Sequence, residues 1–560
     1  MCKKKLCILC LIIACTLYLP CQIVNDSQLL KSDSWIYEAL STLSLESQDT
    51  LFLDTKPISV GELKFYFSQI DFEKLSDSGK SLYQQVEKFL FSTNYFWKNY
   101  KNQQEELATR IDVGLKINPE LYLRTNKNIP SSINYHFKDW FLTVPIIFGI
   151  SENVTLQLDV IHGKNFEDSK NPNSYSNIPF SDSEKEYEFP RFAYGNIGAY
   201  FKDWGFSATF GREGFSIGDT KLGSIIYNSS FETDFYSTFS TYSPYFKYNL
   251  VASQAGKDKF IFLHNFNLKI FSNLKISFTE GCLRNGPFEL RFLNPSMLLH
   301  NFYAGFKYGK DDPLKEYDLD NHYCSYMGIT IDFYPIKNAR IYALWAQTEL
   351  QTSGELSNSN GKMLPDGYGL QLGFDYVIPI KKEKYFFLNI ESLFTTPYLY
   401  VKQSPDWSMI TFRDDYKTSK DVATWIGTPF GPDTFAISTS FILKQPRLWT
   451  FGFEYLFLAK GEINSDTLLQ TKEGFPAYYP YVEYCLGYIS QEEAIKKARQ
   501  FGLTGTVQYQ NDFSILGEYQ FNNNICFAAE GTYSLIFNYN HEKGNFQDNF
   551  ELKLSLSYAL

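Results

Sequence analysis

The chain has 560 residues, of which 44% are hydrophobic and 18% aromatic, and its formal net charge is −10. So many aromatic rings exclude a disordered or low-complexity protein. The acidic balance excludes the basic surface that nucleic-acid binding needs, so no nucleic-acid partner is expected.

The first 21 residues have the pattern of a secretory signal peptide. Three lysines at positions 3–5 precede an apolar run, Leu6 to Leu19, that is too short to span a membrane as a helix. Simple cleavage is favoured over lipoprotein processing at Cys15 or Cys21, because Pro20 makes the second site poor. We therefore expect an exported chain. Only four cysteines follow the leader, which is not a disulfide framework: Cys282, Cys324, Cys485 and Cys526.

Residues 22–104 have the spacing of helices and predict a small periplasmic helical segment. After a capping residue at 33 or 34, Ile36, Leu40 and Leu43 recur at helical spacing. Ser59 with Glu62 three residues later forms a capping box, which predicts a second helix. A third helix is expected to begin after position 78 or 81. Their apolar faces need a partner, and the simplest arrangement is a self-packed cap.

From residue 105 to 560 the hydrophobic period changes to two. Val154, Leu156, Leu158 and Val160 alternate with polar residues, and segments 111–117, 327–345 and 515–529 do the same. Each such segment predicts a strand with one apolar and one polar face. No transmembrane helix is expected after the leader.

Short turns alternate with long polar loops, such as those at 163–190 and 403–421. A transmembrane β-barrel has this asymmetry, and roughly 25 residues per strand and connection predict about 18 strands. The alternative, a soluble sandwich, rarely continues so long without a break. Apolar residues alternate without fault from Phe550 to Leu560, as in the closing strand of an outer-membrane barrel. The fold class is therefore an all-β, large antiparallel transmembrane barrel over residues 105–560, with most aromatic rings facing lipid.

Several segments, in order, resemble the outer-membrane capsule-assembly family typified by Wzi. They are Leu53–Ser59 with Gly61-Glu62, Gly211–Gly214, Gly218, Gly223–Ser229, Glu280-Gly281, Gly286, Phe292–Pro295, Tyr342–Glu349, Gly369–Gly373, Pro397–Tyr400 and Gly427–Asp433. The resemblance implies a large barrel with a helical element on its periplasmic side. It also implies a protein that binds capsular or related polysaccharide at the cell surface and is not an enzyme.

Motifs for catalysis or metal binding do not emerge from the chain. There is no Walker A loop, no G-x-S-x-G elbow and no H-E-x-x-H, and the six histidines are scattered. His322 and Cys324 provide only two of the ligands that a metal site needs. Asp318 and Asp320 are expected to be charged loop residues in contact with solvent. The more specific alternative is that they bind calcium. We expect no enzyme activity, cofactor or metal.

A loop from 406 to 425 combines rings with planar polar groups, which is what sugar binding requires. The candidate glycan-binding residues are Trp407, Arg413, Asp414, Tyr416 and Trp425. The alternative for Trp407 and Trp425 is a place in the aromatic girdle of the barrel.

Charged residues beside strand-like runs are expected in the lumen or near the membrane interfaces, because charge facing lipid at the midplane is costly. The candidate lumen charges are Arg212, Glu213, Arg284, Glu289 and Arg291. Bracing of the interior is the expected role, and selection of anionic solutes is the alternative.

Together these patterns predict an outer-membrane barrel that binds surface polysaccharide and assists its assembly or retention. A porin-like channel for small solutes is the alternative function. The expected partners are outer-membrane lipid, the surface polysaccharide and the barrel-assembly machinery.

Overall fold

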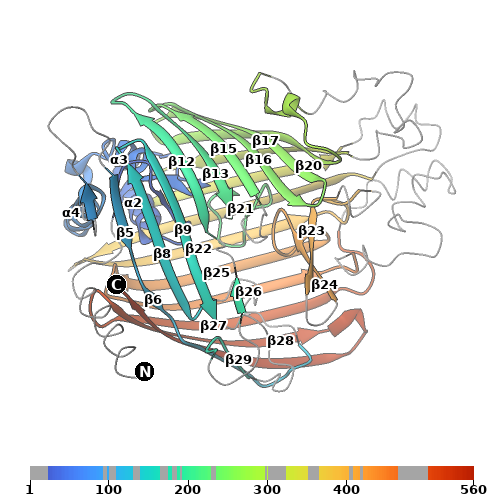
Figure 1. Ribbon diagram of the computed structural model, residues 1–560. Helices are drawn as coiled ribbons and strands as arrows, with labels where there is room; N and C mark the ends of the chain where they lie inside the picture. The colour runs from blue at the N-terminus through green and yellow to red at the C-terminus, as the bar shows by residue number, and fades with distance from the viewer. Residues whose placement is uncertain are drawn as a thin grey trace, which may run out of the picture.

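The computed structural model describes residues 23–92, 97–99, 109–129, 139–163, 174–179, 186–188, 192–212, 214–228, 235–296, 299, 323–350, 365–381, 383–402, 408–415, 420–463 and 502–560. Within them, one antiparallel sheet closes on itself as a barrel (Figure 1). The signal-peptide prediction for residues 1–21 lies outside the described residues.

The barrel wall consists of eighteen strands, which confirms the predicted strand number. The first of them is interrupted and consists of β5 (Thr109–Val113), β6 (Lys116–Ile117) and β7 (Glu120–Arg124). The others are β8 (Leu142–Ile150), β9 (Val154–Gly163), β12 (Ala193–Tyr200), β13 (Gly205–Arg212), β15 (Phe235–Tyr242), β16 (Phe246–Gly256), β17 (Lys259–Phe271), β18 (Leu274–Asn285), β19 (Tyr323–Phe333), β20 (Ala339–Glu349), β21 (Gly367–Ile380), β22 (Lys384–Thr395), β25 (Thr434–Gln445), β26 (Trp449–Lys460), β27 (Gln508–Gln520), β28 (Ile525–Phe537) and β29 (Phe546–Ala559). Closure occurs where β29 pairs with β6 and β7, while β5 and β6 pair with β8.

Shorter elements extend the barrel or lie apart from it. They are β4 (Trp97–Asn99), β10 (Ser174–Ser176), β11 (Glu186–Glu188), η3 (Leu290–Leu293), η8 (Tyr539–His541) and the hairpin of β23 (Ile410–Asp415) and β24 (Lys420–Trp425).

Alternation along each strand gives the barrel an apolar outside and a polar inside. In β9, Leu156 and Val160 are exposed on the outer surface, while Thr155 and Asp159 are buried in the lumen. The last strand follows the same rule, with Phe550 exposed and Glu551 buried. The predicted faces of these strands are therefore confirmed.

The aromatic rings divide between the two faces by type, so the expectation that most rings face lipid is wrong for tyrosine. Phenylalanines dominate the exposed rings, for example Phe451 and Phe513. Tyrosines dominate the buried ones, among them Tyr326, Tyr342 and Tyr400. The hydroxyls of these three tyrosines find hydrogen-bond partners in the lumen, which lipid would not provide.

Three helices occupy residues 23–92, together with η1 (Phe72–Lys74) and the strands β1 (Leu29–Leu30), β2 (Thr55–Lys56) and β3 (Ile58–Ser59). They are α2 (Trp35–Ser47), α3 (Val60–Phe67) and α4 (Asp77–Phe91). The predicted cap of α3 is present, because the Ser59 hydroxyl accepts a hydrogen bond from the Glu62 amide. The predicted caps of the third helix at Ser78 or Ser81 are wrong: Ser76 caps α4, and the Ser78 hydroxyl instead donates to the Ile380 carbonyl.

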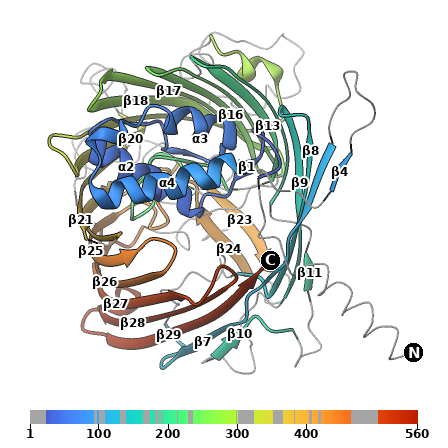
Figure 2. The same ribbon diagram turned by 90° about the vertical axis from the view of Figure 1, so that its left-hand side faces the viewer.

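The helical segment lies across one mouth of the barrel, where Figure 2 shows α2, α3 and α4 in front of the strands. This is the mouth with short turns. The Thr50 amide donates to the Ser272 carbonyl and the Asn338 amide to the Leu45 carbonyl. The helices also pack on Tyr242 and Tyr385 at the ends of wall strands. The segment 23–92, called the plug below, is therefore packed against the barrel as well as on itself.

Candidate functional site

Two segments between strands fold into the lumen instead of leaving it. One follows β13 and covers residues 214–228, here called the luminal loop; its β14 (Ser216–Ile217) pairs with β2 of the plug. The other runs from 396 to 433 and carries the β23–β24 hairpin. Figure 1 shows this hairpin crossing the interior of the barrel.

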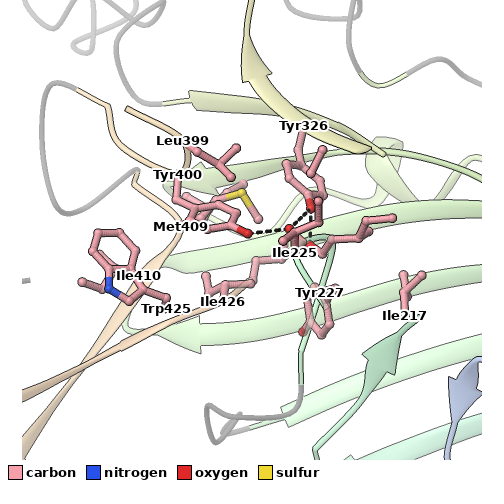
Figure 3. Close-up of a cluster of buried hydrophobic side chains, with 14 of the residues drawn as sticks. Ile217, Ile225, Tyr227, Tyr326, Leu399, Tyr400, Met409, Ile410, Trp425 and Ile426 are labelled. Carbon is pink, nitrogen blue, oxygen red and sulfur yellow. Dashed lines mark hydrogen bonds between the residues drawn. The ribbon is translucent and has the colours of Figure 1, made fainter. Parts of the chain in front are cut away.

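The luminal loop, the hairpin and the wall share one apolar core (Figure 3). Ile225 is fully buried, and its carbonyl accepts hydrogen bonds from the hydroxyl of Tyr400 at 2.5 Å and of Tyr326 at 3.0 Å. The Asn228 amide donates to the Ile426 carbonyl at 2.9 Å, which joins the luminal loop to the end of the hairpin. Burial raises the pKa of the Tyr400 hydroxyl well above its usual value, so it stays a donor.

This core explains why several segments that carry the family resemblance are rich in glycine. At Gly427 a side-chain carbon would stand against the ring of Tyr400, and at Gly431 it would meet Trp425. Gly431 also has a φ of +72°, which side chains other than glycine rarely tolerate. The chain can therefore turn tightly around both rings.

The base of the hairpin is fixed from several sides. The Lys259 ammonium on the wall donates to the Ile410 carbonyl at 2.5 Å, and the Ile426 amide donates to the Met409 carbonyl at 3.0 Å. Ile410 and Ile426 are fully buried. The base of the hairpin is therefore fixed to both the wall and the luminal loop.

The predicted glycan-binding residues divide between base and tip. Trp425 is only 5% exposed and packs on Tyr400, so its predicted alternative place in the lipid-facing girdle is wrong. Its burial also makes it part of the base and not a ring free for stacking. The backbones of Arg413 and Asp414 pair with Val422 and Asp421 near the far end of the hairpin. Trp407, Tyr416 and the side chains of Arg413 and Asp414 lie outside the described residues.

The predicted lumen position of the arginines is corrected by the structure. Leu283 belongs to the luminal core, so the neighbouring Arg284 lies on the outer face of β18, over the ring of Phe292. Arg284 and Arg291 both pair with Glu289, close to η3. These ion pairs have the expected structural role of holding neighbouring segments together, but they lie outside the lumen.

Arg212 is the last residue of β13 and shares the outer face with Phe210, which is 55% exposed. Charge at a strand end lies near the membrane interface, where it costs little. Glu213 lies outside the described residues.

Buried charge pairs that the sequence reasoning missed join the plug to the wall. Lys247 of β16 pairs with Glu62 of α3 at 2.6 Å, and both side chains are almost fully buried. Lys275 of β18 pairs with Asp54 at 2.9 Å and with Asp332 at 3.3 Å. Lysines at lumen-facing positions of otherwise regular strands are the signal that could have found them.

A second charged contact joins the plug to the luminal loop. The Lys56 ammonium lies 2.8 Å from the Asp219 carboxylate, and the Arg340 guanidinium donates to the Asp219 carbonyl at 3.0 Å. Burial alone would raise the pKa of Asp219, but the positive charges of Lys56 and Arg340 outweigh it and lower the pKa to about 2. The carboxylate is therefore ionised at any physiological pH.

A polar chamber of about 450 Å³ lies on the side of the lumen away from β16 and β18, between the luminal loop and strands β25–β28. Three carboxylates line it, from Glu454, Asp512 and Glu530, together with the Lys221 ammonium. Lys221 and Glu454 pair at 2.5 Å across the chamber wall. The hydroxyls of Ser514 and Thr532 and the ring of Phe430 complete a lining suited to polar solutes.

Among the residues that the structure describes, no three histidine, cysteine, aspartate or glutamate side chains gather as a metal site. Within the same part of the chain, no helix has the length and hydropathy needed to cross a membrane.

Comparison with solved structures supports the barrel fold. The structure of Wzi from Escherichia coli, described as a carbohydrate-binding β-barrel involved in group 1 capsule assembly, is similar over 94% of this chain and 98% of that chain, with 12% identity and a TM-score of 0.55. OprD of Pseudomonas aeruginosa (80% and 95% covered, 8% identity, TM-score 0.38) and the channel DcaP of Acinetobacter baumannii (81% and 97%, 9%, 0.34) are less similar. No protein-family model and no curated protein matches the sequence. The chain thus has the fold of an outer-membrane β-barrel.

Proposed function

We propose that the chain is an outer-membrane barrel that holds surface polysaccharide at the far end of its β23–β24 hairpin and assists the assembly or retention of that polymer. The observation that carries the proposal is the packed lumen. Strands that could enclose a pore instead enclose a buried base, and the hairpin is built on it. The proposed role is binding and not catalysis.

The chemistry of the hairpin supports a glycan ligand. Trp407 and Tyr416 provide rings, and Arg413 and Asp414 provide planar groups that bind hydroxyls in pairs. The buried contacts of Ile410 and Trp425 hold the base of the hairpin, whose strand β23 carries Arg413 and Asp414. The fold similarity to a carbohydrate-binding barrel supports the same ligand class.

The porin-like alternative has less support. Nonpolar contacts between the luminal loop, the hairpin and the wall occupy much of the described interior. A general porin needs a continuous aqueous lumen. We propose the outer membrane as the location, with lipid around the apolar outer face and the barrel-assembly machinery as the partner during insertion.

The proposal is tested by measuring how the purified full chain binds polysaccharide extracted from the surface of the same cells. Replacing Trp407, Arg413, Asp414 and Tyr416 together by alanine should weaken binding by on the order of tenfold or more, as losing two or more contacts of about 1 kcal/mol implies. The matched control replaces Glu542 and Lys543, in a different loop, and should bind like the unchanged chain. Equal binding by both variants would rule out the hairpin.

A further inference from the structure

A row of three cavities follows one side of the lumen, between the plug and strands β22–β28. The first, about 410 Å³, opens beside α2 and the turn at Arg447, at the mouth that the plug covers. The second, about 260 Å³, lies between α2, the luminal loop and the wall. The third is the chamber of about 450 Å³ described above.

Neighbouring cavities share lining residues, so they lie next to each other. Glu38 and Lys444 line both the first and the second cavity, and Thr220 and Lys221 line both the second and the third. The residues shared by two cavities separate them. A path along the row from the plug-side mouth to the chamber therefore has two narrow points.

An ion pair lies at each narrow point. Glu38 of α2 and Lys444 of β25, which both line the first and second cavities, pair with each other. Lys221 of the luminal loop lines the second and third cavities and pairs with Glu454 of β26, which lines the third cavity alone. Glu38 and Lys221 keep 54% and 38% of their side chains exposed. Such solvated pairs are weak, on the order of 1 kcal/mol or less, so they open readily.

On the other side of the plug, buried ion pairs join it to the wall. There the plug contacts the wall through Lys247–Glu62 and Lys275–Asp54, whose side chains are at most 5% exposed. Lumen-facing Ser277 on that side is 1% exposed, whereas lumen-facing Ser514 beside the chamber is half-buried.

We propose that small solutes enter the chamber from the plug-side mouth along this row, and that cations and neutral polar molecules are favoured over anions. The charge of the chamber gives the preference, since three carboxylates face one ammonium there. The cavity volumes limit the solute to about the size of a monosaccharide or disaccharide. This pathway is independent of the proposed glycan-binding hairpin.

The test uses thiol labelling of the full chain in detergent micelles. Cys485 and Cys526 are first replaced by serine, and that parent gives the background rate, because Cys282 and Cys324 are buried. Ser514→Cys reports on the chamber, Asn228→Cys, whose half-buried side chain also lines the chamber, is a second reporter in case the first variant folds poorly, and Ser277→Cys is the matched control. The reagents are a cationic and an anionic methanethiosulfonate of similar size.

We expect Ser514→Cys to react faster with the cationic reagent than with the anionic one, by on the order of tenfold. Ser277→Cys should stay at the background rate. Adding Lys444→Met, which removes the first ion pair, should speed the labelling of Ser514→Cys several-fold, and Lys444→Arg, which keeps the pair, should not.

Two results would overturn the proposal. If both chamber reporters react no faster than Ser277→Cys, solutes do not reach the chamber. If they react but Lys444→Met leaves the rate unchanged, solutes arrive by another route. Polysaccharide binding of the same variants is expected to be unchanged, so failure of this pathway and failure of the proposed function are distinguishable.

Discussion

The two sides of the barrel wall have the same alternation of residues but different surroundings. On the packed side, strands β16–β22, lumen-facing residues such as Ser277, Asn265 and Glu391 are buried under the plug and the luminal loop. On the polar side, strands β26–β28, lumen-facing Ser514 and Glu530 remain half-buried beside a chamber. The period of a strand therefore assigns its residues to a face, but the contents of the lumen decide whether that face is dry.

Charge on the two sides has a correspondingly different role. Lys247 and Lys275 on the packed side are buried and paired with carboxylates of the plug, which makes plug and wall depend on each other. Lys221 and Glu454 on the polar side are partly exposed, and solvent screens their attraction. Stability is expected to depend mainly on the first set and solute selection on the second.

The largest difference in stability between the two sides is expected when a buried ion pair of the packed side is broken. Glu62→Gln leaves the Lys247 ammonium buried without its counter-charge, and also changes the acceptor of the Tyr66 hydroxyl. We expect a loss of about 4 kcal/mol in the free energy of unfolding, measured by urea titration in lipid vesicles. The matched variant Glu454→Gln on the polar side should lose about 1 kcal/mol or less. Equal losses would mean that the two sides do not differ.

A cavity in the apolar core should show the same contrast without charge. Ile426 is fully buried between the hairpin and the luminal loop, so Ile426→Ala is expected to cost about 3 kcal/mol. Leu516 faces the lumen on the polar side and is half-buried, so Leu516→Ala should cost far less. The same urea titration compares the two variants. A larger loss of unfolding free energy for Leu516→Ala would contradict the assignment of the tightly packed core to the hairpin and the luminal loop.

Much of the barrel could be predicted from the sequence because its faces follow from local alternation. The residues Leu274, Ile276 and Phe278 even assign Arg284, six residues beyond Phe278, to the outer face of β18. The predicted lumen position is wrong for Arg284, whereas the alternative that was also expected, a place near the membrane interface, fits a residue at the end of its strand. Pairing with Glu289 near the end of the strand removes most of the cost of charge facing lipid.

The interior of the site could not be predicted, because it depends on contacts between distant segments. Lys275 and Asp54 are 221 residues apart, and no local pattern links them. Trp425 has the composition of either a girdle ring or a sugar platform, and only the inward path of its loop makes it part of the core. Glycines at 427 and 431 carried the relevant signal, since they mark places where the backbone passes close to a large ring.

Removing a tyrosine hydroxyl should lower the free energy of unfolding more in the lumen than on the outer face, and the difference should be smaller than in the two cases above. Tyr400→Phe leaves the Ile225 carbonyl with one donor fewer and the Thr428 amide without its acceptor, inside the dry core. We expect a loss of about 1–2 kcal/mol by urea titration. Tyr533 is 40% exposed on the outer face, and its contact with Asp548 is exposed too, so Tyr533→Phe should be nearly neutral. A neutral Tyr400→Phe would show that water reaches this core.

Asp219 stands at the border between the two sides, and its contribution should be the smallest and dependent on pH. Lys56 and Arg340 lower its pKa from 3.8 to about 2, so the folded chain binds a proton there less readily than the unfolded chain. The resulting stabilisation is complete above pH 3.8, decreases as the pH falls, and is lost below pH 2. Because 36% of the side chain is exposed, solvent screening limits it to about 1 kcal/mol or less.

The measurement is the difference in unfolding free energy between the unchanged chain and Asp219→Asn, taken at pH 6 and again near pH 2. Asparagine keeps the size of the side chain but cannot carry the charge, so the difference at pH 6 should disappear near pH 2. If the same difference persisted at pH 2, hydrogen bonding or packing would be responsible instead of charge. Lys56 would then contribute to the border between plug and luminal loop through its contact with the Tyr37 ring, 5.2 Å away, and not through the carboxylate.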